Sequence, residues 1–277
     1  MEYSPRRMSE LLDSNDFKFK KKFGQNFIVD QNIIDKIILE SGVDKDTMVI
    51  EIGPGAGSLT YKLASASNNV LCYEIDETLK DILFNNLSQF NNVDIKFGDF
   101  LNCDVLSDLK NYSYDKLYVV ANLPYYITTP IIMKIIEDKI PVDKIVVMVQ
   151  KEVGDRFKAL PGSKDYGSLS IFLNYYFDVV KLMDISRNIF IPKPNVDSIV
   201  VEFRRKENSF SLKDEDLFFK LVRDSFRQKR KTIRNNLNGY DLNIIESVLS
   251  KYGYDLSVRA EALGIDIFVD IANNLTK

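Results

Sequence analysis

The chain has 277 residues, of which 45% are hydrophobic, and its formal net charge is −3. This length is enough for one large domain and a small one, and because no apolar run is long enough to cross a membrane we expect a cytoplasmic protein. The sequence has no histidine, which excludes a Ser-His-Asp triad and zinc held by imidazole, and we expect no metal centre. The two cysteines, Cys72 and Cys103, form no Cys-x-x-Cys pattern and are expected to be free, buried thiols.

Residues 17–27, near the N-terminus, form a basic and aromatic stretch. It interleaves lysines with phenylalanines. Such a stretch can be a solvated arm with a few anchored rings, or an arm that contacts phosphates and folds over a ligand. Spacing alone leaves both interpretations open.

Strands and helices then alternate, which predicts βαβ units and a mostly parallel sheet. The expected helices are an amphipathic one at 31–40, then 60–66, one around 79–83, and 131–137 after a Thr128-Thr129-Pro130 cap. The expected strands are 48–52, 70–73, 93–97, one that ends at Asn122, and 144–149.

A glycine-rich turn, residues 53–57, connects the first of these strands to its helix. Glycines allow a tight turn and a close approach of a ligand to the backbone. Gly53 and Gly55 fit the dinucleotide fingerprint, but Ser58 stands where its third glycine belongs. The turn alone therefore leaves a plain tight turn and a dinucleotide site as alternatives.

Acidic residues at the ends of three strands help to decide which ligand the glycine-rich turn binds. They are Glu51, Glu74 and Asp99. Glu74 follows Gly53 by 21 residues, where a carboxylate can bind ribose hydroxyls. A pyrophosphate beside Glu51 would be repelled, whereas S-adenosylmethionine carries a sulfonium and an ammonium and no phosphate. The acids therefore favour S-adenosylmethionine.

The strand that ends at Asn122 continues as Leu123-Pro124-Tyr125-Tyr126. Ligands bind outside the C-terminal ends of strands in open α/β sheets. An amide, a fixed turn and an aromatic ring at that place suit a flat ligand with an NH2 group, such as adenine. By itself the same motif is compatible with a plain turn that leaves a strand.

The remaining chain changes character near residue 206. Before it lie an apolar core segment at 169–177 and two strands, 178–183 and 198–203, that could pair as an edge. After it the pattern is helical, with a dense basic cluster formed by Arg227, Lys229, Arg230, Lys231 and Arg234. We therefore expect domains at 1–205 and 206–277.

With these motifs placed, the sequence resembles the rRNA adenine N6-dimethyltransferase family, and within it the small-subunit (16S) enzymes. The resemblance covers nearly the whole chain. Its motifs are 23–27, 51–55, 122–125, 150–153, 162–170, 190–198, 230–237 and 259–261. Two departures, at 254–257 and 262–264, lie in the small domain and bear on the fit to RNA. The resemblance implies an α/β fold, with a Rossmann-like S-adenosylmethionine-dependent methyltransferase domain and a small all-α C-terminal domain.

The resemblance also implies roles for individual residues. Asn26 and Ile28 would close over S-adenosylmethionine, Gly53 would lie against its methionine part, and Glu74 would take the ribose hydroxyls. Asp99 would take the adenine amino group. Asn122 would sit between cofactor and target base.

The chemistry that we expect is acceptance of the two N6 hydrogens by the Asn122 side chain and the Pro124 carbonyl, which frees the nitrogen lone pair for the methyl group. Tyr125 would stack on one face of an extruded base and Phe190 would cover the other. The basic residues at 18–22 and 227–234 would hold the RNA backbone.

The function that this implies is dimethylation of two adjacent adenosines near the 3′ end of 16S rRNA, in an immature 30S subunit, by a monomer. Two alternatives stay open. One is a ribosome-assembly factor that acts chiefly by binding, and the other is a 23S rRNA methyltransferase that confers macrolide resistance.

Overall fold

The structure is a computed structural model that describes residues 20, 25–207 and 210–276. Contacts divide the chain into two compact units. The first combines Met1–Gly154 with Val180–Arg204, and the second combines Asp155–Val179 with Arg205–Lys277. The boundary near residue 206 thus coincides with a change of unit, while 155–179 belongs to the second one. The division into domains at 1–205 and 206–277 stays a prediction.

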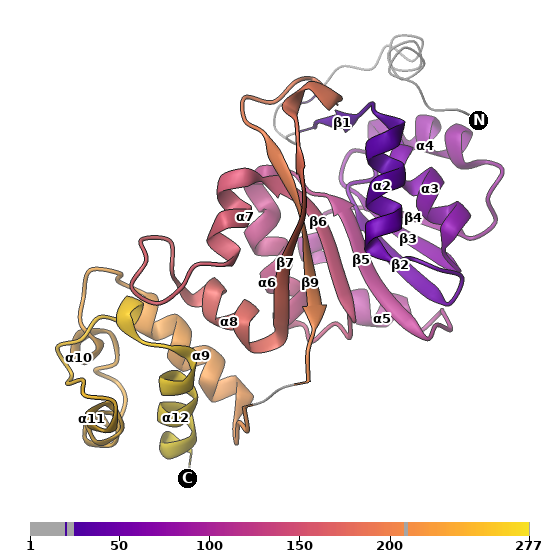
Figure 1. Cartoon of the computed structure of the whole chain (residues 1–277). Helices are drawn as coiled ribbons and strands as arrows, with labels where there is room; N and C mark the ends of the chain where they lie inside the picture. The colour runs from indigo at the N-terminus through magenta and orange to yellow at the C-terminus, as the bar shows by residue number, and fades with distance from the viewer. Residues whose placement is uncertain (1–19, 21–24, 208–209, 277) are drawn as a thin grey trace. The chain divides into compact units, whose positions relative to one another are not determined.

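A seven-stranded sheet forms the first unit, in the order β4-β3-β2-β5-β6-β9-β7 (Figure 1). Neighbours from β4 to β6 are parallel, and β9 is antiparallel to β6. The mostly parallel sheet is confirmed, as is the pairing of the two late strands at its edge. The strands are β2 (Thr47–Ile52), β3 (Asn69–Glu74), β4 (Val93–Phe97), β5 (Lys116–Asn122), β6 (Lys144–Gln150), β7 (Phe177–Ile185) and β9 (Ser198–Arg205). A separate two-stranded sheet pairs β1 (Phe27–Ile28) with β8 (Phe190–Ile191).

Helices lie on both sides of the seven-stranded sheet (Figure 1). They are α2 (Gln31–Ser41), α3 (Ser58–Ala66), α4 (Lys80–Leu87), α5 (Val105–Leu109), α6 (Thr128–Glu137) and α7 (Lys151–Phe157), with short 3₁₀ turns η2 (Glu77–Leu79), η3 (Phe100–Asn102), η4 (Tyr125–Ile127) and η5 (Arg187–Ile189). One core cluster joins α2 and α3 to the sheet through Ile37, Leu63 and Val120. Every residue of β2 is buried, as a strand covered on both faces must be.

One expectation about α6 was wrong. Thr128 does not cap a helix that begins after Pro130, because α6 already begins at Thr128 and follows η4 directly. Pro130 lies in its first turn, where a missing backbone N–H costs nothing. The chain therefore turns sharply just after Asn122.

The strand order locates the ligand crevice. From β2 the chain proceeds outward through β3 and β4, and it then returns to place β5 and β6 on the other side of β2. The order reverses between β2 and β5, so their C-terminal ends diverge there. Such a switch point is where open α/β sheets bind ligands.

The second unit is built from α8 (Ser168–Tyr176), α9 (Glu215–Phe226), α10 (Ile233–Asn236), η6 (Ala260–Ala262), α11 (Leu242–Lys251) and α12 (Ile265–Leu275). The apolar segment expected at 169–177 lies mostly in helix α8, where most of its residues are buried, and its Phe172 ring packs 4.5 Å from the Phe219 ring of α9. Asp214 caps α9, whose first turn carries Glu215 and Asp216. Within the described residues, no helix has the length and apolar character needed to cross a membrane.

Candidate active site

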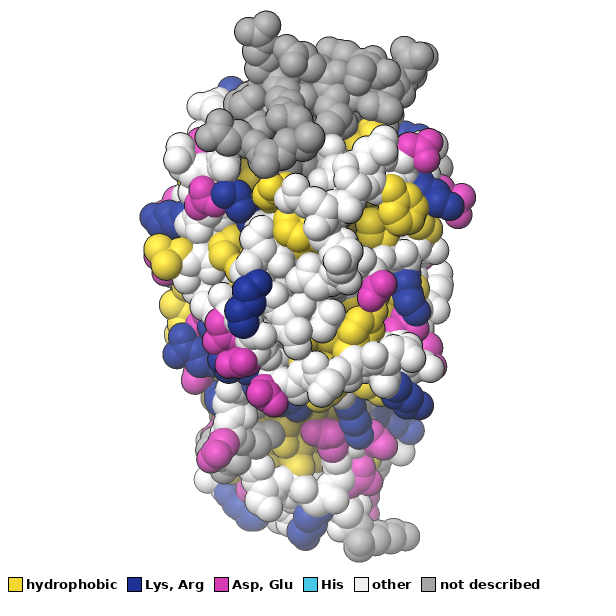
Figure 2. All heavy atoms as spheres, turned by 90° about the vertical axis from the view of Figure 1, so that its right-hand side faces the viewer, with side chains coloured by type: hydrophobic (Ala, Val, Ile, Leu, Met, Phe, Trp, Pro, Cys, Tyr) yellow, Lys and Arg dark blue, Asp and Glu magenta, His cyan; other side chains and the backbone are white. Residues whose placement is uncertain are grey.

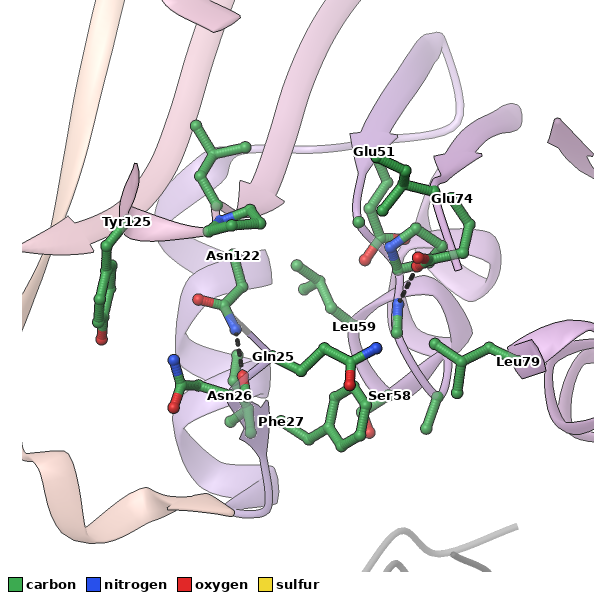
Figure 3. Close-up of a pocket in the computed structure, with 18 residues that line it drawn as sticks. Gln25, Asn26, Phe27, Glu51, Ser58, Leu59, Glu74, Leu79, Asn122 and Tyr125 are labelled. Atoms are coloured by element: carbon green, nitrogen blue, oxygen red, sulfur yellow. Dashed lines mark hydrogen bonds between the residues drawn. The ribbon is translucent and has the colours of Figure 1, made fainter. Parts of the chain in front are cut away.

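A pocket lies at the switch point, at the C-terminal ends of β2, β3 and β5 (Figure 3). Its walls come from the segment 25–28, the glycine turn after β2 with the start of α3, the end of β3, Leu79 of η2 and the residues that follow β5. Nine residues singled out from the sequence line it, namely Asn26, Ile28, Glu51, Gly53, Gly55, Glu74, Asn122, Pro124 and Tyr125. The fold thus brings together side chains that are up to 99 positions apart in the sequence.

The glycine turn allows another part of the chain to approach closely. Gly55 has a φ of +61°, which side chains disfavour. A Cβ at this position would lie 2.6 Å from the ring of Phe27. The turn therefore accommodates the Phe27 ring directly against its backbone.

Glu74 is held by the backbone of its neighbours. Its two carboxylate oxygens accept hydrogen bonds from the N–H groups of Gly55, at 3.0 Å, and of Asp76, at 2.8 Å. Burial raises its pKa to about 7, although these backbone bonds act in the opposite direction. Its geometry is set before any ligand arrives, which is a useful property in a group that orients ribose hydroxyls.

Glu51 is buried more deeply, with 1% of its surface exposed. Burial, with a contribution from the charge of Glu74, raises the pKa of Glu51 to about 8. Its carboxyl group accepts a weak bond from the thiol of Cys72, 3.7 Å away. Cys72 is buried as expected, whereas Cys103 is only partly buried, and both are free thiols.

The charge of the pocket is one-sided. Its described lining residues include the carboxyl groups of Glu51 and Glu74 and neither lysine nor arginine. In their ionised form, two buried carboxyl groups without a cation favour a positively charged ligand and disfavour a phosphate. The residues therefore fit S-adenosylmethionine, and they fit a dinucleotide poorly.

Asn122 is oriented by the segment that crosses in front of it. Its side-chain NH2 donates to the backbone carbonyl of Asn26, with a distance of 2.8 Å (Figure 3). This bond assigns the amide nitrogen to the Asn26 side and turns the oxygen toward the side on which Tyr125 lies. The oxygen is therefore presented as a hydrogen-bond acceptor.

The carbonyl of Pro124 is engaged within its own turn. It accepts from the N–H of Ile127 and from the hydroxyl of Thr128, each at 3.2 Å. A carbonyl oxygen has two lone pairs, so both are directed at η4 and α6. Its expected part as an acceptor for a substrate amine is weakened by these contacts.

Two other expected residues lie outside the lining of the pocket. Asp99 caps η3 by accepting from the N–H of Leu101. Phe190 is 2% exposed and packs in the core with Ile28, its partner in the β1–β8 pair. The roles of Asp99 toward an adenine amino group and of Phe190 over a base stay predictions, and in this structure the Phe190 ring is turned into the core.

The basic cluster of the second unit lies in and after the turn that follows α9. Its five side chains are exposed: Arg227, Lys229, Arg230, Lys231 and Arg234. The ammonium of Lys229 donates to the carbonyl of Lys164, so part of the cluster braces its own unit. On the face seen in Figure 2, cations and carboxylates are interspersed, so attraction of a polyanion depends on local clusters such as this one.

Three residues near the pocket were given no role from the sequence, although two of them, Gln25 and Ser198, lie in the motifs 23–27 and 190–198. Gln25 lines the pocket, Asp76 binds Gln25, and Ser198 binds Tyr125. The signal for Asp76 was the Asp-x-Thr pattern that begins η2, where a capping carboxylate is expected. The local sequence does not reveal the partner of Ser198, because Tyr125 is 73 positions away.

Comparison with known proteins identifies the family. The family described as "Ribosomal RNA adenine dimethylase" matches residues 16–277. The chain belongs to this family. It is 46% identical to "Ribosomal RNA small subunit methyltransferase A" of Macrococcus caseolyticus, over 100% of this chain and 98% of that one, and 44% identical to the protein of the same name from Staphylococcus carnosus, over 99% and 96%.

Solved structures of similar proteins agree with this family assignment. The dimethyladenosine transferase of Plasmodium falciparum superposes with a TM-score of 0.73 at 27% identity, over 88% of this chain and 95% of that one. The 23S rRNA methyltransferase ErmE shares the fold, with a TM-score of 0.65 at 24% identity over 91% and 100%. As a member of the family, the protein is an rRNA adenine methyltransferase that uses S-adenosylmethionine. The Rossmann-like fold class is confirmed.

Proposed function

We propose that the protein dimethylates N6 of two adjacent adenosines near the 3′ end of 16S rRNA, acting as a cytoplasmic monomer on an immature small subunit. The observation that carries this is the oriented amide of Asn122, placed at the rim of a pocket with two carboxyl groups and no cation among its described lining residues. The names of the full-length relatives, which specify the small subunit, support the choice of RNA.

Different pocket residues would bind different parts of the cofactor. Glu74 would bind its ribose, Glu51 would attract its positive charge, and the turn at Gly53 would lie against its methionine part. When bound, S-adenosylmethionine supplies a methyl group that is already activated. No strong base is then needed, in keeping with a chain without histidine.

Asn122 would act on the target amine. The N6 lone pair of adenine is delocalised into the ring, which makes the nitrogen a poor nucleophile. Acceptance of one N6 hydrogen by the Asn122 oxygen would hold the nitrogen in place and favour a tetrahedral geometry. The second acceptor would come from the same turn. Because the Pro124 carbonyl already accepts two bonds, we assign this part to the carbonyl of Leu123, a residue that also lines the pocket.

Tyr125 would provide the stacking surface for the extruded base. Stacking on an aromatic ring contributes about 1–3 kcal/mol per base. The ring lines the pocket next to Asn122 (Figure 3). The exposed cations after α9 would contact RNA phosphates.

The direct test is incubation of the protein with labelled S-adenosylmethionine and unmethylated small subunits, followed by mapping of the modified nucleotides. We expect two adjacent dimethylated adenosines near the 3′ end of 16S rRNA. Label in 23S rRNA, or reduced macrolide susceptibility on expression, would support the resistance-type alternative instead.

The Asn122→Ala variant separates catalysis from binding. We expect a loss of methylation of about 10²–10³-fold, as for removal of one oriented hydrogen-bonding group in other enzymes. Asn85→Ala, at an exposed position of α4, is the matched control. If Asn122→Ala still restores subunit maturation in full, the assembly role dominates.

A further inference from the structure

A short segment, Gln25–Ile28, crosses the front of the pocket, and we call it the strap. All four of its residues line the pocket. On one side it is attached to the sheet region, because the Asn26 carbonyl accepts from Asn122 and because Phe27 and Ile28 pair with β8. In its middle the Phe27 ring lies against the glycine turn.

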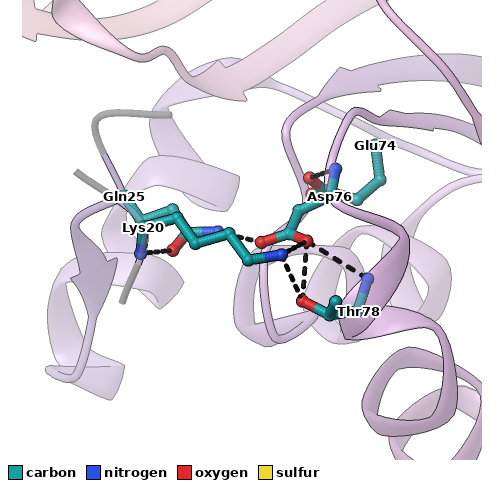
Figure 4. A network of polar contacts seen from close by, with 5 residues as sticks. All are labelled: Lys20, Gln25, Glu74, Asp76 and Thr78. Atoms are coloured by element: carbon teal, nitrogen blue, oxygen red, sulfur yellow. Dashed lines mark hydrogen bonds and ion pairs between the residues drawn. The ribbon is translucent and has the colours of Figure 1, made fainter. Parts of the chain in front are cut away.

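On the other side the strap is bound by Asp76, which follows β3 (Figure 4). One carboxylate oxygen of Asp76 accepts from the Gln25 side chain at 2.8 Å. The other accepts from the ammonium of Lys20 at 2.6 Å. The backbone N–H of Lys20 in turn donates to the Gln25 side-chain oxygen at 2.9 Å. Lys20, Gln25 and Asp76 thus form a closed set of contacts, which we call the latch.

The latch is built around a buried carboxylate. The side chain of Asp76 is 1% exposed, whereas that of Lys20 is 32% exposed. Burial alone would raise the pKa of Asp76, but the hydrogen bonds from Lys20, Thr78 and Gln25 outweigh it and lower this pKa. A buried carboxylate that loses a charged partner is left with an uncompensated desolvation cost. Release of Lys20 is therefore unfavourable while Asp76 stays buried.

The same residue supports the cofactor side of the pocket. The backbone N–H of Asp76 donates to a carboxylate oxygen of Glu74 at 2.8 Å. The side chain of Asp76 holds the strap, and its main chain holds the group that would bind ribose. One residue therefore connects the position of the strap to the orientation of Glu74.

We propose that Lys20, Gln25 and Asp76 are positioning residues that fasten the strap over bound cofactor, so that the latch sets how long the cofactor stays in the pocket. This assigns Lys20 a partner inside the protein and not an RNA phosphate. It extends the function proposed above, but it concerns the cofactor site alone and does not depend on which RNA is methylated.

The test compares Lys20→Met with Lys20→Arg and with Lys181→Met. Met keeps the length of the side chain without the charge, and Arg restores a cation. Lys181 forms an exposed ion pair with Asp184 on β7, at 2.7 Å, and serves as the control. The probe is S-adenosylhomocysteine without RNA, and its dissociation constant and dissociation rate are measured by calorimetry and stopped flow.

We expect Lys20→Met to accelerate dissociation of S-adenosylhomocysteine about tenfold, as loss of a charge-assisted bond implies. Amide hydrogen exchange at Phe27 and Val29 is expected to quicken by a similar factor. KM for S-adenosylmethionine rises, while kcat at saturation and KM for RNA stay unchanged. Lys20→Arg is expected to recover most of the loss, and Lys181→Met to behave as the parent protein.

The Asp76→Asn variant provides a second, independent test of the latch. In its background, Lys20→Met should have a much smaller effect on the dissociation rate, because the ion pair between the two residues is already lost and only the bond of Lys20 to the Thr78 hydroxyl, at 2.9 Å, remains to be removed. The proposal is overturned if Lys20→Met leaves the affinity for S-adenosylhomocysteine unchanged, whether RNA binding weakens, the melting temperature falls or neither changes. Should Asp76→Asn fail to fold, the Lys20 series still decides the matter.

Discussion

The hydroxyl of Tyr125 lies 2.7 Å from the hydroxyl of Ser198, the first residue of β9. Ser198 is fully buried. The residue before it, Asp197, accepts from the N–H of Arg187 at 3.0 Å, and its own carbonyl accepts from Lys151 at 3.1 Å. The start of β9 is therefore fixed from two sides, and it fixes in turn the ring that would stack on the target base.

The first prediction concerns this pair. Ser198→Ala leaves the Tyr125 hydroxyl without its partner, and we expect methylation of rRNA to slow about fivefold, in line with a net hydrogen bond of about 1 kcal/mol. Steady-state kinetics check this. Tyr125→Phe keeps the ring and should cost a similar factor, and the double variant should be no slower than Tyr125→Phe. Additive losses would show that Ser198 acts on something other than Tyr125.

The second prediction is a pH dependence of cofactor affinity. Without ligand, Glu51 has a pKa of about 8 and Glu74 of about 7, so both take up protons as the pH falls through this range. A protonated carboxyl is neutral and no longer attracts a cation. The affinity for S-adenosylmethionine should therefore fall by roughly tenfold or more between pH 8.5 and pH 6, as calorimetry can measure.

A ligand without the sulfonium charge is the control for this pH dependence. S-adenosylhomocysteine should show a shallower decline over the same range. Glu51→Gln should flatten the profile for S-adenosylmethionine and lower its affinity at pH 8.5. Parallel profiles for the two ligands would contradict the role assigned to Glu51.

The third prediction concerns the contact between Gly55 and Phe27. Gly55→Ala places a Cβ in a left-handed conformation, which costs about 1–2 kcal/mol, and drives it against the Phe27 ring. The strap would have to move, so the affinity for S-adenosylhomocysteine should fall at least about tenfold. Gly239→Ala, where the added Cβ meets no atom within 4 Å, is the matched control. If Gly55→Ala binds S-adenosylhomocysteine with full affinity, the strap can move away from the added Cβ without weakening the cofactor site.

The fourth prediction concerns the basic cluster after α9. Replacement of Arg230 and Lys231 by Ala should weaken rRNA binding and reduce the slope of log K against log salt by about one per lost phosphate contact. A salt titration of binding measures both. Affinity for S-adenosylhomocysteine should not change, and Lys181→Ala should leave RNA binding as it is. An unaltered salt dependence would place the RNA contacts elsewhere.

Local patterns were enough to predict the parallel sheet, the glycine turn and the ends of β2, β3 and β5. Each depends on neighbours in the chain: alternation of apolar runs for the strands, φ preference for Gly55, and chain direction for Glu74 and Asn122. Residue types at those ends indicated a cationic ligand and an adenine, and family membership agrees with that prediction. The start of α6 was missed because η4 continues into it without a side-chain cap.

The amino-acid sequence by itself determined the fold class, the acidic strand ends and the amide-aromatic tip, because those properties arise from residues close together in the chain. Only the tertiary structure decided that Asn26 orients the Asn122 amide, that Ser198 holds the Tyr125 ring, and that Lys20 contacts Asp76. These contacts join residues that are far apart in the chain, and no local propensity encodes them.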